Sequence, residues 1–473
     1  MLFQNLNNFK KNIAIFDNKK KIYYKDLAKD VKELEKKLED KNRNLCFLVA
    51  ENSPTFIKLY ISLVRLNYVI ILIDVKINSD NLENLVNDYK PNLILIPKNY
   101  ILRFKKKILF KYSNYLILKH EKSLHKLNKE LLIMLPTSGT TGSSKMVMLS
   151  KANIYKNSKD IIKYLGLKKY HIALANLPFH YSYGLSILNT HLMCGAKLFL
   201  QKNNIISKEF KNLFSKNKIN CFYGVPETYE IFKRLDLKIQ KSFKFFAIAG
   251  GKISKNSLKF LIKIADELKI NIFNMYGQTE ASPRISFSKY IDKRDLRKIY
   301  TVGRCFGGGK IFIKKNNRIL KKNSVGNIYY YGKNVMIGYA KSFKDLNNKR
   351  INKFLIETGD LGFLDENNNL NLSGRNDRYI KLDSERVNLN DVEDMLNAKF
   401  YNNKYLIIFL KNKINILSDK KSSLNFEEDY LISKLKIKRN YVNSLANFKF
   451  EYLSNGKLNY KNIEKKLIKN FTK

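Results

Sequence analysis

The stretch LCFLVAENSPTFIKLYISLVRLNYVIILID, residues 45–74, decides the fold of this chain. It opens with an apolar run typical of a buried strand, and the run ends at a turn that contains Pro54. Apolar residues then recur at helical spacing over residues 55–67, and a second apolar run covers residues 68–74. A strand, a helix and a strand in this order are typical of a parallel sheet with helices packed on its faces.

The same alternation returns along much of the chain. We expect further helices over residues 22–39, 81–89, 152–165, 206–216 and 254–268, and strands over residues 92–97, 172–177, 220–224 and 270–274. Short β segments follow from about residue 300, with a hairpin over 362–375 and, beyond it, strands over 404–410 and 448–453. The expected fold class is therefore α/β, with doubly wound mixed sheets and a β-rich subdomain in residues 1–376 and a small α+β domain in residues 377–473.

The composition is strongly basic, with 89 Lys and Arg residues against 41 Asp and Glu and a net charge of +48. Such a charge suits a nucleic acid or another acidic partner. However, most of the basic residues are lysines spread along the whole chain, which favours compositional drift of exposed positions. The four cysteines form no CxxC pair, the N-terminus has no signal-peptide pattern, and no apolar run is long enough for a transmembrane helix. We therefore expect a cytoplasmic protein.

A loop rich in Gly, Ser and Thr lies within LPTSGTTGSSKMVMLS, residues 135–150. It joins a predicted strand to a later helix, for which Ser150 is a candidate N-cap. Gly139 and Gly142 would let the backbone approach a ligand, and successive N–H groups and hydroxyls can hold phosphate oxygens. Lys145 would add a positive charge, although the spacing is not that of a Walker P-loop. From these residues alone, a phosphate-binding loop and a flexible linker both stay open.

Five further motifs follow this loop along the chain. They are LPFHYSYG (177–184), AIAGGKIS (247–254), MYGQTEAS (275–282), TGDLGFLDENNNLNLSGRNDRYIKLDSERV (358–387) and SNGKLNY (454–460). Together with LPTSGTTGSSK, and in this order, they resemble the motifs of the adenylate-forming (AMP-binding) superfamily. That superfamily includes acyl-CoA synthetases, the adenylation domains of peptide synthetases, and luciferases. The resemblance covers nearly the whole chain.

The resemblance implies an acid–thiol ligase. ATP would activate a small-molecule carboxylic acid to acyl-AMP with release of pyrophosphate, and the acyl group would pass to coenzyme A or to the phosphopantetheine of an acidic carrier protein. ATP, Mg²⁺ and one of these thiols are the implied cofactors, and no nucleic acid is expected. Two alternatives stay open: an enzyme that stops at acyl-AMP or serves a carrier protein alone, and a basic nucleic-acid-binding protein on an inactive adenylating scaffold.

The resemblance also implies roles for individual residues around ATP. Glu280 would hold Mg²⁺, for which a carboxylate is a preferred ligand, and Thr279 would hydrogen-bond the α-phosphate. Tyr276 would stack on adenine, Asp360 would accept from both ribose hydroxyls, and Arg375 would donate to the ribose or the phosphates. The remaining nucleotide-binding positions are Thr137, Ser138, Gly139, Thr140, Thr141, Gly142, Lys145, Gly250, Gly251 and Gly277.

Three residues are implied in the chemistry of the two half-reactions. Lys457 would bridge the carboxylate and the α-phosphate during adenylation, and Lys381 would belong to the face that serves the thioester step. His180 would line the wall of the acyl site and the thiol tunnel. A mobile C-terminal domain would exchange the two lysines by turning about a hinge at Asp377.

Three positions depart from the pattern of the superfamily. Met146 replaces a glycine at the end of the phosphate loop, and Arg378 stands where a second Asp is common. Ser384 replaces a glycine that would lie close to pantetheine, so its side chain could narrow the approach of the thiol.

Overall fold

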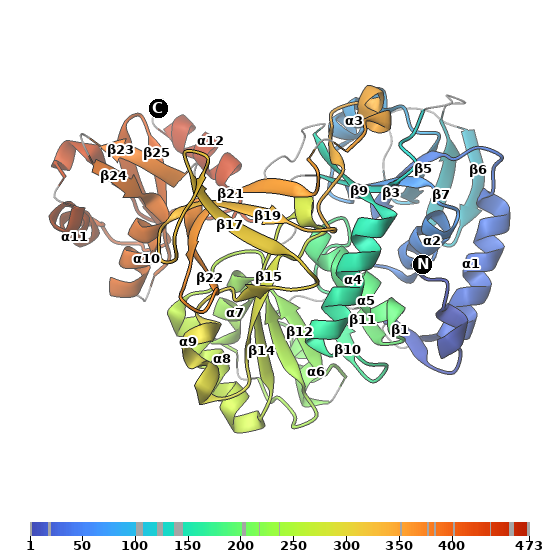
Figure 1. Cartoon of the computed structure of the whole chain (residues 1–473), viewed down its shortest axis with the longest axis horizontal. Helices are drawn as coiled ribbons and strands as arrows, with labels where there is room; N and C mark the ends of the chain where they lie inside the picture. The colour runs from blue at the N-terminus through green and yellow to red at the C-terminus, as the bar shows by residue number, and fades with distance from the viewer. Residues whose placement is uncertain are drawn as a thin grey trace. The chain divides into compact units, whose positions relative to one another are not determined.

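A computed structural model describes residues 2–17, 20–100, 107–120, 126–136, 145–200, 205–216, 218–235, 237–350, 352–375, 378–382, 385–400, 403–435, 437–453 and 458–470. The chain forms two compact units (Figure 1). The first comprises residues 1–311 and 330–356, and the second comprises residues 312–329 and 357–473. This division lies upstream of the predicted boundary between residues 376 and 377. The predicted boundary marks the hinge of a mobile lid, and it stays a prediction.

Two large mixed sheets form the first unit. The spatial order of the nine-stranded sheet is β16 (Arg304–Cys305), β15 (Ser286–Tyr290), β14 (Asn271–Tyr276), β13 (Phe245–Ile248), β12 (Cys221–Gly224), β10 (Ile172–Leu174), β11 (Lys197–Leu200), β1 (Ile13–Asp17) and β2 (Lys20–Tyr23). The order of the eight-stranded sheet is β20 (Gly338–Ala340), β9 (Met146–Ser150), β8 (Leu131–Pro136), β4 (Val69–Asp74), β3 (Leu45–Ala50), β5 (Leu93–Pro97), β7 (Tyr115–Lys119) and β6 (Lys107–Tyr112). Both sheets are parallel in the middle and antiparallel at their edges, as expected for doubly wound mixed sheets.

Helices cover these sheets because each carries apolar residues at helical spacing. The helices of the first unit are α1 (Tyr24–Leu38), α2 (Pro54–Arg65), α3 (Ser79–Tyr89), α4 (Lys151–Leu165), α5 (Ser182–Met193), α6 (Lys208–Ser215), α7 (Pro226–Phe232), α8 (Lys255–Leu268) and α9 (Leu296–Ile299). Helices α6, α7 and α8 bury their apolar faces on β12, β13 and β14, and α8 runs along this side of the sheet (Figure 1). By contrast, α5 is buried on every side from Ser182 to Leu192, so it lies inside the unit.

Smaller sheets form the second unit. The five-stranded sheet has the order β18 (Arg318–Ile319), β17 (Lys310–Lys315), β19 (Gly326–Tyr331), β21 (Leu355–Leu364) and β22 (Leu370–Arg375). A pair, β23 (Tyr379–Leu382) and β24 (Glu385–Asn388), is followed by a three-stranded sheet of β25 (Tyr405–Leu410), β26 (Lys413–Ser418) and β27 (Val442–Leu445). Helices α10 (Leu389–Lys399), α11 (Asn425–Leu435) and α12 (Tyr460–Asn470) accompany these strands. In the described part of the whole chain, no helix is long and apolar enough to cross a membrane.

Two predictions about local structure were wrong or incomplete. Residues 448–453 form no strand; instead Phe448 and Phe450 pack into an apolar cluster with α12, and the third strand of the sheet is β27. Residues 146–150, expected to lead into a helix, form β9, which pairs antiparallel with β8. The expected cap is confirmed, because Ser150 Oγ accepts a hydrogen bond from Asn153 N at 3.0 Å at the start of α4.

The chain turns back very closely between β14 and β15. A Cβ atom added at Gly277 would lie 1.7 Å from the carbonyl oxygen of Pro283, so only a glycine fits there without movement. Ile285 N donates to Tyr276 O at 2.9 Å and closes the turn. The residues of the YGQTE motif are therefore held by a backbone contact that has no room for a side chain.

We expect Gly277→Ala to lower the free energy of unfolding by about 1–3 kcal/mol, because the added methyl group forces the turn apart. Urea unfolding measures this loss. The matched control is Gly338→Ala in β20, where an added Cβ meets only Met148 Cε at 3.8 Å. The free energy of unfolding of this control should change by less than about 0.5 kcal/mol. Equal losses in both variants would contradict the crowding at Gly277.

The buried His191 of α5 should make the protein sensitive to acid. Its Nδ1 lies 2.9 Å from Ile187 O, and burial lowers the pKa of the imidazole to about 3. The unfolded chain takes up this proton near pH 6.5 and the folded chain does so only near pH 3, so acidification through that window favours unfolding. Between pH 6.5 and about 4.5, His191→Gln should therefore lose about 2 kcal/mol less unfolding free energy than the wild type. Urea titrations at both pH values measure these losses. If the variant and the wild type lose the same unfolding free energy between the two pH values, the prediction is wrong.

Candidate functional site

Two motif turns leave the nine-stranded sheet at the carboxyl ends of adjacent parallel strands. Gly224 at the end of β12 pairs with Ile248 at the end of β13, and Ile248 pairs with Asn274 in β14. The turn at Gly250 follows β13, with a φ of 95° that suits glycine, and the turn at Gly277 follows β14. Ligands of open α/β sheets bind at this edge, so the predicted Gly-Gly and YGQTE motifs lie where a ligand is expected.

Glu280 lies in a short 3₁₀ turn, Thr279–Ala281, directly after these strands. Tyr339 in β20 donates its hydroxyl to Glu280 Oε1 at 2.9 Å. Lys145 Nζ lies 3.8 Å from the centroid of the Tyr339 ring, which is cation–π distance. Burial, and then the charge of Glu280, raise the pKa of Tyr339, so its hydroxyl stays a donor at neutral pH. The structure thus brings together two predicted residues, Lys145 and Glu280, through a tyrosine that the sequence did not point to.

Thr279 joins this turn to the LPFHYSYG motif. Its buried Oγ1 lies 3.2 Å from the Ser182 Oγ at the start of α5. His180 lies two residues earlier; its side chain is 5% exposed, with Nε2 3.5 Å from Asp74 Oδ2 at the end of β4. Burial lowers the pKa of His180 and outweighs the opposing effect of Asp74, so the imidazole is neutral at pH 7. A neutral ring at this position can accept or donate a hydrogen bond.

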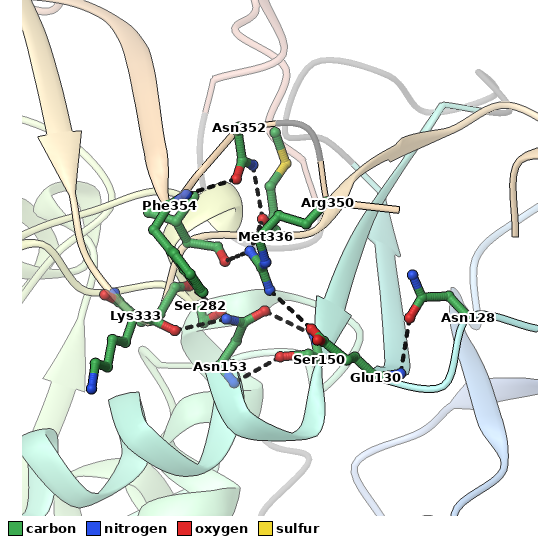
Figure 2. A network of polar contacts seen from close by, with 12 residues as sticks. Asn128, Glu130, Ser150, Asn153, Ser282, Lys333, Met336, Arg350, Asn352 and Phe354 are labelled. Carbon is green, nitrogen blue, oxygen red and sulfur yellow. Dashed lines mark hydrogen bonds and ion pairs between the residues drawn. The ribbon is translucent and has the colours of Figure 1, made fainter. Parts of the chain in front are cut away.

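A network of polar contacts holds the segment formed by residues 333–336 (Figure 2). Met336 N donates to the Glu280 carbonyl oxygen at 2.8 Å. On its other side, Arg350 donates to the carbonyl oxygens of Val335 at 2.7 Å and Met336 at 2.5 Å. Asn352 Nδ2 adds a third bond, to Met336 O, at 2.8 Å.

The same segment is also held from the α4 side (Figure 2). Asn153 Nδ2, beside the cap of α4, donates to Lys333 O at 2.8 Å, and Ser282 Oγ donates to Asn334 O at 2.8 Å. Arg350 reaches back to Glu130 at 3.4 Å. Residues 333–336 belong to no helix or strand, so these side chains satisfy carbonyl groups that would otherwise be orphaned. The network therefore fixes the position of Glu280 without touching its carboxylate.

Asp360 and Arg375 meet within the second unit. They face each other across β21 and β22, and Arg375 Nε donates to Asp360 Oδ1 at 3.1 Å. The Arg375 side chain is 54% exposed and that of Asp360 only 14%. Their part in nucleotide binding stays a prediction.

Arg378 is anchored within the second unit. It donates to Ile407 O at 2.8 Å and to Asn390 Oδ1 at 3.0 Å, and it forms an ion pair with Glu393. Its charge is therefore neutralised by a carboxylate of α10. Arg378, which stands where an Asp is common in the superfamily pattern, therefore adds a structural ion pair.

Several predicted residues cannot be placed. Those outside the described residues are Thr137, Ser138, Gly139, Thr140, Thr141, Gly142, Asp377, Ser384 and Lys457. Lys381 lies in β23, in register with Arg386 of β24. Met146 is the first residue of β9 and is buried.

One further residue beside the site had no role in the sequence interpretation. Arg284, four residues after Glu280, is only 3% exposed, and its guanidinium carbon lies 4.3 Å from the centroid of the Tyr183 ring. A charged residue between Pro283 and Ile285 in a stretch of small and apolar residues is the signal that could have identified it.

The chain is similar in sequence to known proteins. The chain is 26% identical over 271 residues to a 2-succinylbenzoate–CoA ligase of Bacillus cereus (strain ZK / E33L), an alignment that covers 57% of this chain and 54% of that protein. The chain thus spans about half the length of the curated relatives that it matches.

Solved structures share the fold. O-succinylbenzoate coenzyme A synthetase (MenE) from Bacillus subtilis, in complex with ATP and magnesium ion, superimposes with a TM-score of 0.76 at 16% identity, covering 97% of this chain and 98% of that one. Its complex with the acyl-adenylate intermediate OSB-AMP gives a TM-score of 0.75 at 16% identity, covering 97% of each chain. The sequence profile of the AMP-binding enzymes matches residues 2–340, and the chain therefore belongs to the AMP-binding enzyme family.

Proposed function

We propose that the protein is an AMP-forming acid–thiol ligase. A carboxylate oxygen of the substrate attacks the α-phosphorus of ATP, and the bond to pyrophosphate breaks to leave acyl-AMP. The sulfur of a thiol then attacks the acyl carbon, and the bond to AMP breaks to leave a thioester. Coenzyme A or a carrier-protein pantetheine supplies the thiol.

The observation that carries this proposal is the convergence of Glu280, Tyr339 and Lys145 at the carboxyl ends of the parallel strands. Transfer of a nucleotidyl group depends on positioning and on neutralising charge rather than on covalent help from the protein. A fixed carboxylate and a lysine beside it provide both functions. The similar folds solved with ATP and magnesium ion and with an acyl-adenylate support the same chemistry.

Glu280 fits the role of a magnesium ligand. In the described part of the chain its Oε1 accepts from Tyr339, and no ion pair involves its carboxylate. Magnesium usually takes one or two carboxylates and completes its shell with phosphate oxygens and water, so a single half-buried carboxylate suffices. When bound, Mg²⁺ neutralises charge on the phosphates. The chain's own part is to hold Glu280 still through Tyr339 and Met336.

The remaining roles follow the motifs. Tyr276 stacks on adenine, Thr279 donates to the α-phosphate, and Asp360 with Arg375 binds the ribose. Residues 137–142 with Lys145 hold the outer phosphates. Lys457 stabilises the adenylation step, and the lid turns at Asp377 to bring Lys381 to the thioester step. His180 lines the acyl site.

Lys457→Ala tests the two half-reactions separately. We expect the variant to lose ATP–pyrophosphate exchange by about 100-fold or more, because a charge that stabilises the transition state is removed. Supplied acyl-AMP should still react with coenzyme A. Lys465→Ala, an exposed lysine of α12, is the matched control and should exchange normally. If no acid in a broad panel supports exchange by the folded wild type with Mg²⁺, the proposed function is wrong.

Tyr339→Phe tests how Glu280 is held. The ring under Lys145 remains, but Glu280 Oε1 loses its hydrogen bond, so we expect the half-saturating Mg²⁺ concentration to rise about tenfold. Magnesium titration of pyrophosphate exchange measures it. Tyr331→Phe, which removes an exposed hydroxyl in β19, should leave the titration unchanged. If both variants have the same half-saturating Mg²⁺ concentration, Tyr339 does not support Glu280.

A further inference from the structure

Arg284 is a buried cation on the turn that carries the site. Its backbone is fixed, because Asn157 Nδ2 and Asn334 Nδ2 donate to its carbonyl oxygen at 3.1 Å and 2.8 Å. The next residue, Ile285, closes the turn onto Tyr276. These main-chain contacts hold Arg284 beside the YGQTE motif without any contribution from its charge.

The surroundings of the guanidinium are aromatic rather than acidic. It lies over the ring of Tyr183, a residue of the LPFHYSYG motif. Burial raises the pKa of Tyr164 to about 12, against the opposing effects of the Arg284 charge and of a side-chain hydrogen bond with Arg284. Tyr164 in turn stacks on Phe287 at 4.1 Å between ring centroids. Within the described residues no Asp or Glu forms an ion pair with Arg284.

Two buried polar atoms near Tyr183 have no hydrogen-bond partner in the described part of the chain. One is Arg284 Nε, and the other is the hydroxyl of Tyr223, whose ring meets the Tyr183 ring edge-on at 6.3 Å. Tyr223 lies next to Gly224 at the carboxyl end of β12, beside the Gly-Gly turn. Both atoms can donate a hydrogen bond, so both suit an acceptor that comes from outside the chain.

Burying a guanidinium without a carboxylate partner costs more free energy than one cation–π contact contributes. The balance changes when a ligand supplies an anion, because a planar guanidinium binds a carboxylate with two parallel hydrogen bonds. ATP is a poor candidate for that anion. The residues proposed for the nucleotide are Tyr276, Thr279, Glu280 and Lys145, whereas Arg284 faces Tyr183 of the motif assigned to the acyl group.

We propose that Arg284 is a specificity-determining residue that binds a second acidic group of the acyl substrate, so that the substrate is a dicarboxylic acid or an acid with a comparable distal anion. This inference rests on the proposed function for the identity of the reacting end. The buried tyrosines around Arg284 would contact the body of the acid. The far carboxylate would meet Arg284 and the hydroxyl of Tyr223.

The test uses pairs of acids that differ only by the second carboxylate: butanoate and butanedioate, hexanoate and hexanedioate, and 4-phenylbutanoate and 4-(2-carboxyphenyl)butanoate. Thermal unfolding without ATP measures binding, and pyrophosphate exchange with ATP and Mg²⁺ measures turnover. We expect at least one diacid, but not its partner, to raise the unfolding midpoint of the wild type. That diacid should also give the higher kcat/KM in exchange, by about tenfold or more.

Arg284→Met should remove both effects. We expect kcat/KM for the diacid to fall about 100-fold, that for the monoacid to change less than about threefold, and the KM for ATP to stay unchanged. Arg284→Lys keeps the charge but not the planar fork and should recover part of the diacid activity. Arg304→Met, an exposed arginine in the neighbouring β16, is the matched control and should behave as the wild type.

The ligand-free variant separates recognition from a structural role. Removing a buried charge that has no carboxylate partner among the described residues should leave the unfolding midpoint of Arg284→Met within about 1 °C of the wild type or raise it. A clear fall in both Arg284 variants, with monoacids and diacids affected equally, would overturn the inference. So would exchange by the wild type with monoacids and no diacid. Arg284-dependent binding of a diacid without any exchange would support this inference while refuting the proposed ligase activity.

Discussion

Between β14 and β15 the chain turns back so tightly that any side chain at position 277 would overlap the carbonyl group of Pro283. The rest of the site depends on this contact. It holds Tyr276, Thr279 and Glu280 on one side of the turn and Arg284 on the other, a few residues apart and fixed in direction. A looser turn would let the carboxylate and the guanidinium move independently, and a ligand would have to order both on binding.

Hydrogen bonds to carbonyl groups do the rest of the positioning. Residues 333–336 have no strand or helix to satisfy their backbone, and Arg350, Asn352, Asn153 and Ser282 serve as partners instead. A buried carbonyl left without a partner destabilises a protein by about 1–3 kcal/mol, so each of these side chains matters more than an exposed ion pair. The result is a rigid segment that meets Glu280 at its backbone and leaves its carboxylate available for a ligand.

The regular elements of the first unit could be predicted because each has a local signal. Residues 45–74 alternate as β3, α2 and β4, and the Ser150 cap of α4 formed as expected. Failures arose where neighbours distant in sequence decide the outcome. Phe448 and Phe450 have the composition of a strand, but they pack on α12 and β27 takes the place at the sheet edge. In the site, Tyr339 escaped prediction because it reaches Glu280 only through the pairing of β20 with β9, which joins segments nearly two hundred residues apart.

The sequence by itself determined the fold class and the family, since the period of apolar residues and the order of six short motifs are local properties that need no partner. It also identified Thr279, Glu280, Asp360 and Arg375 as candidates. Only the tertiary structure decided which of them meet, that Tyr339 supports Glu280, and that Arg284 is buried over the ring of Tyr183. Burial and pairing depend on contacts between segments far apart in the chain. A charged side chain in a lysine-rich sequence therefore becomes informative only when its surroundings are known.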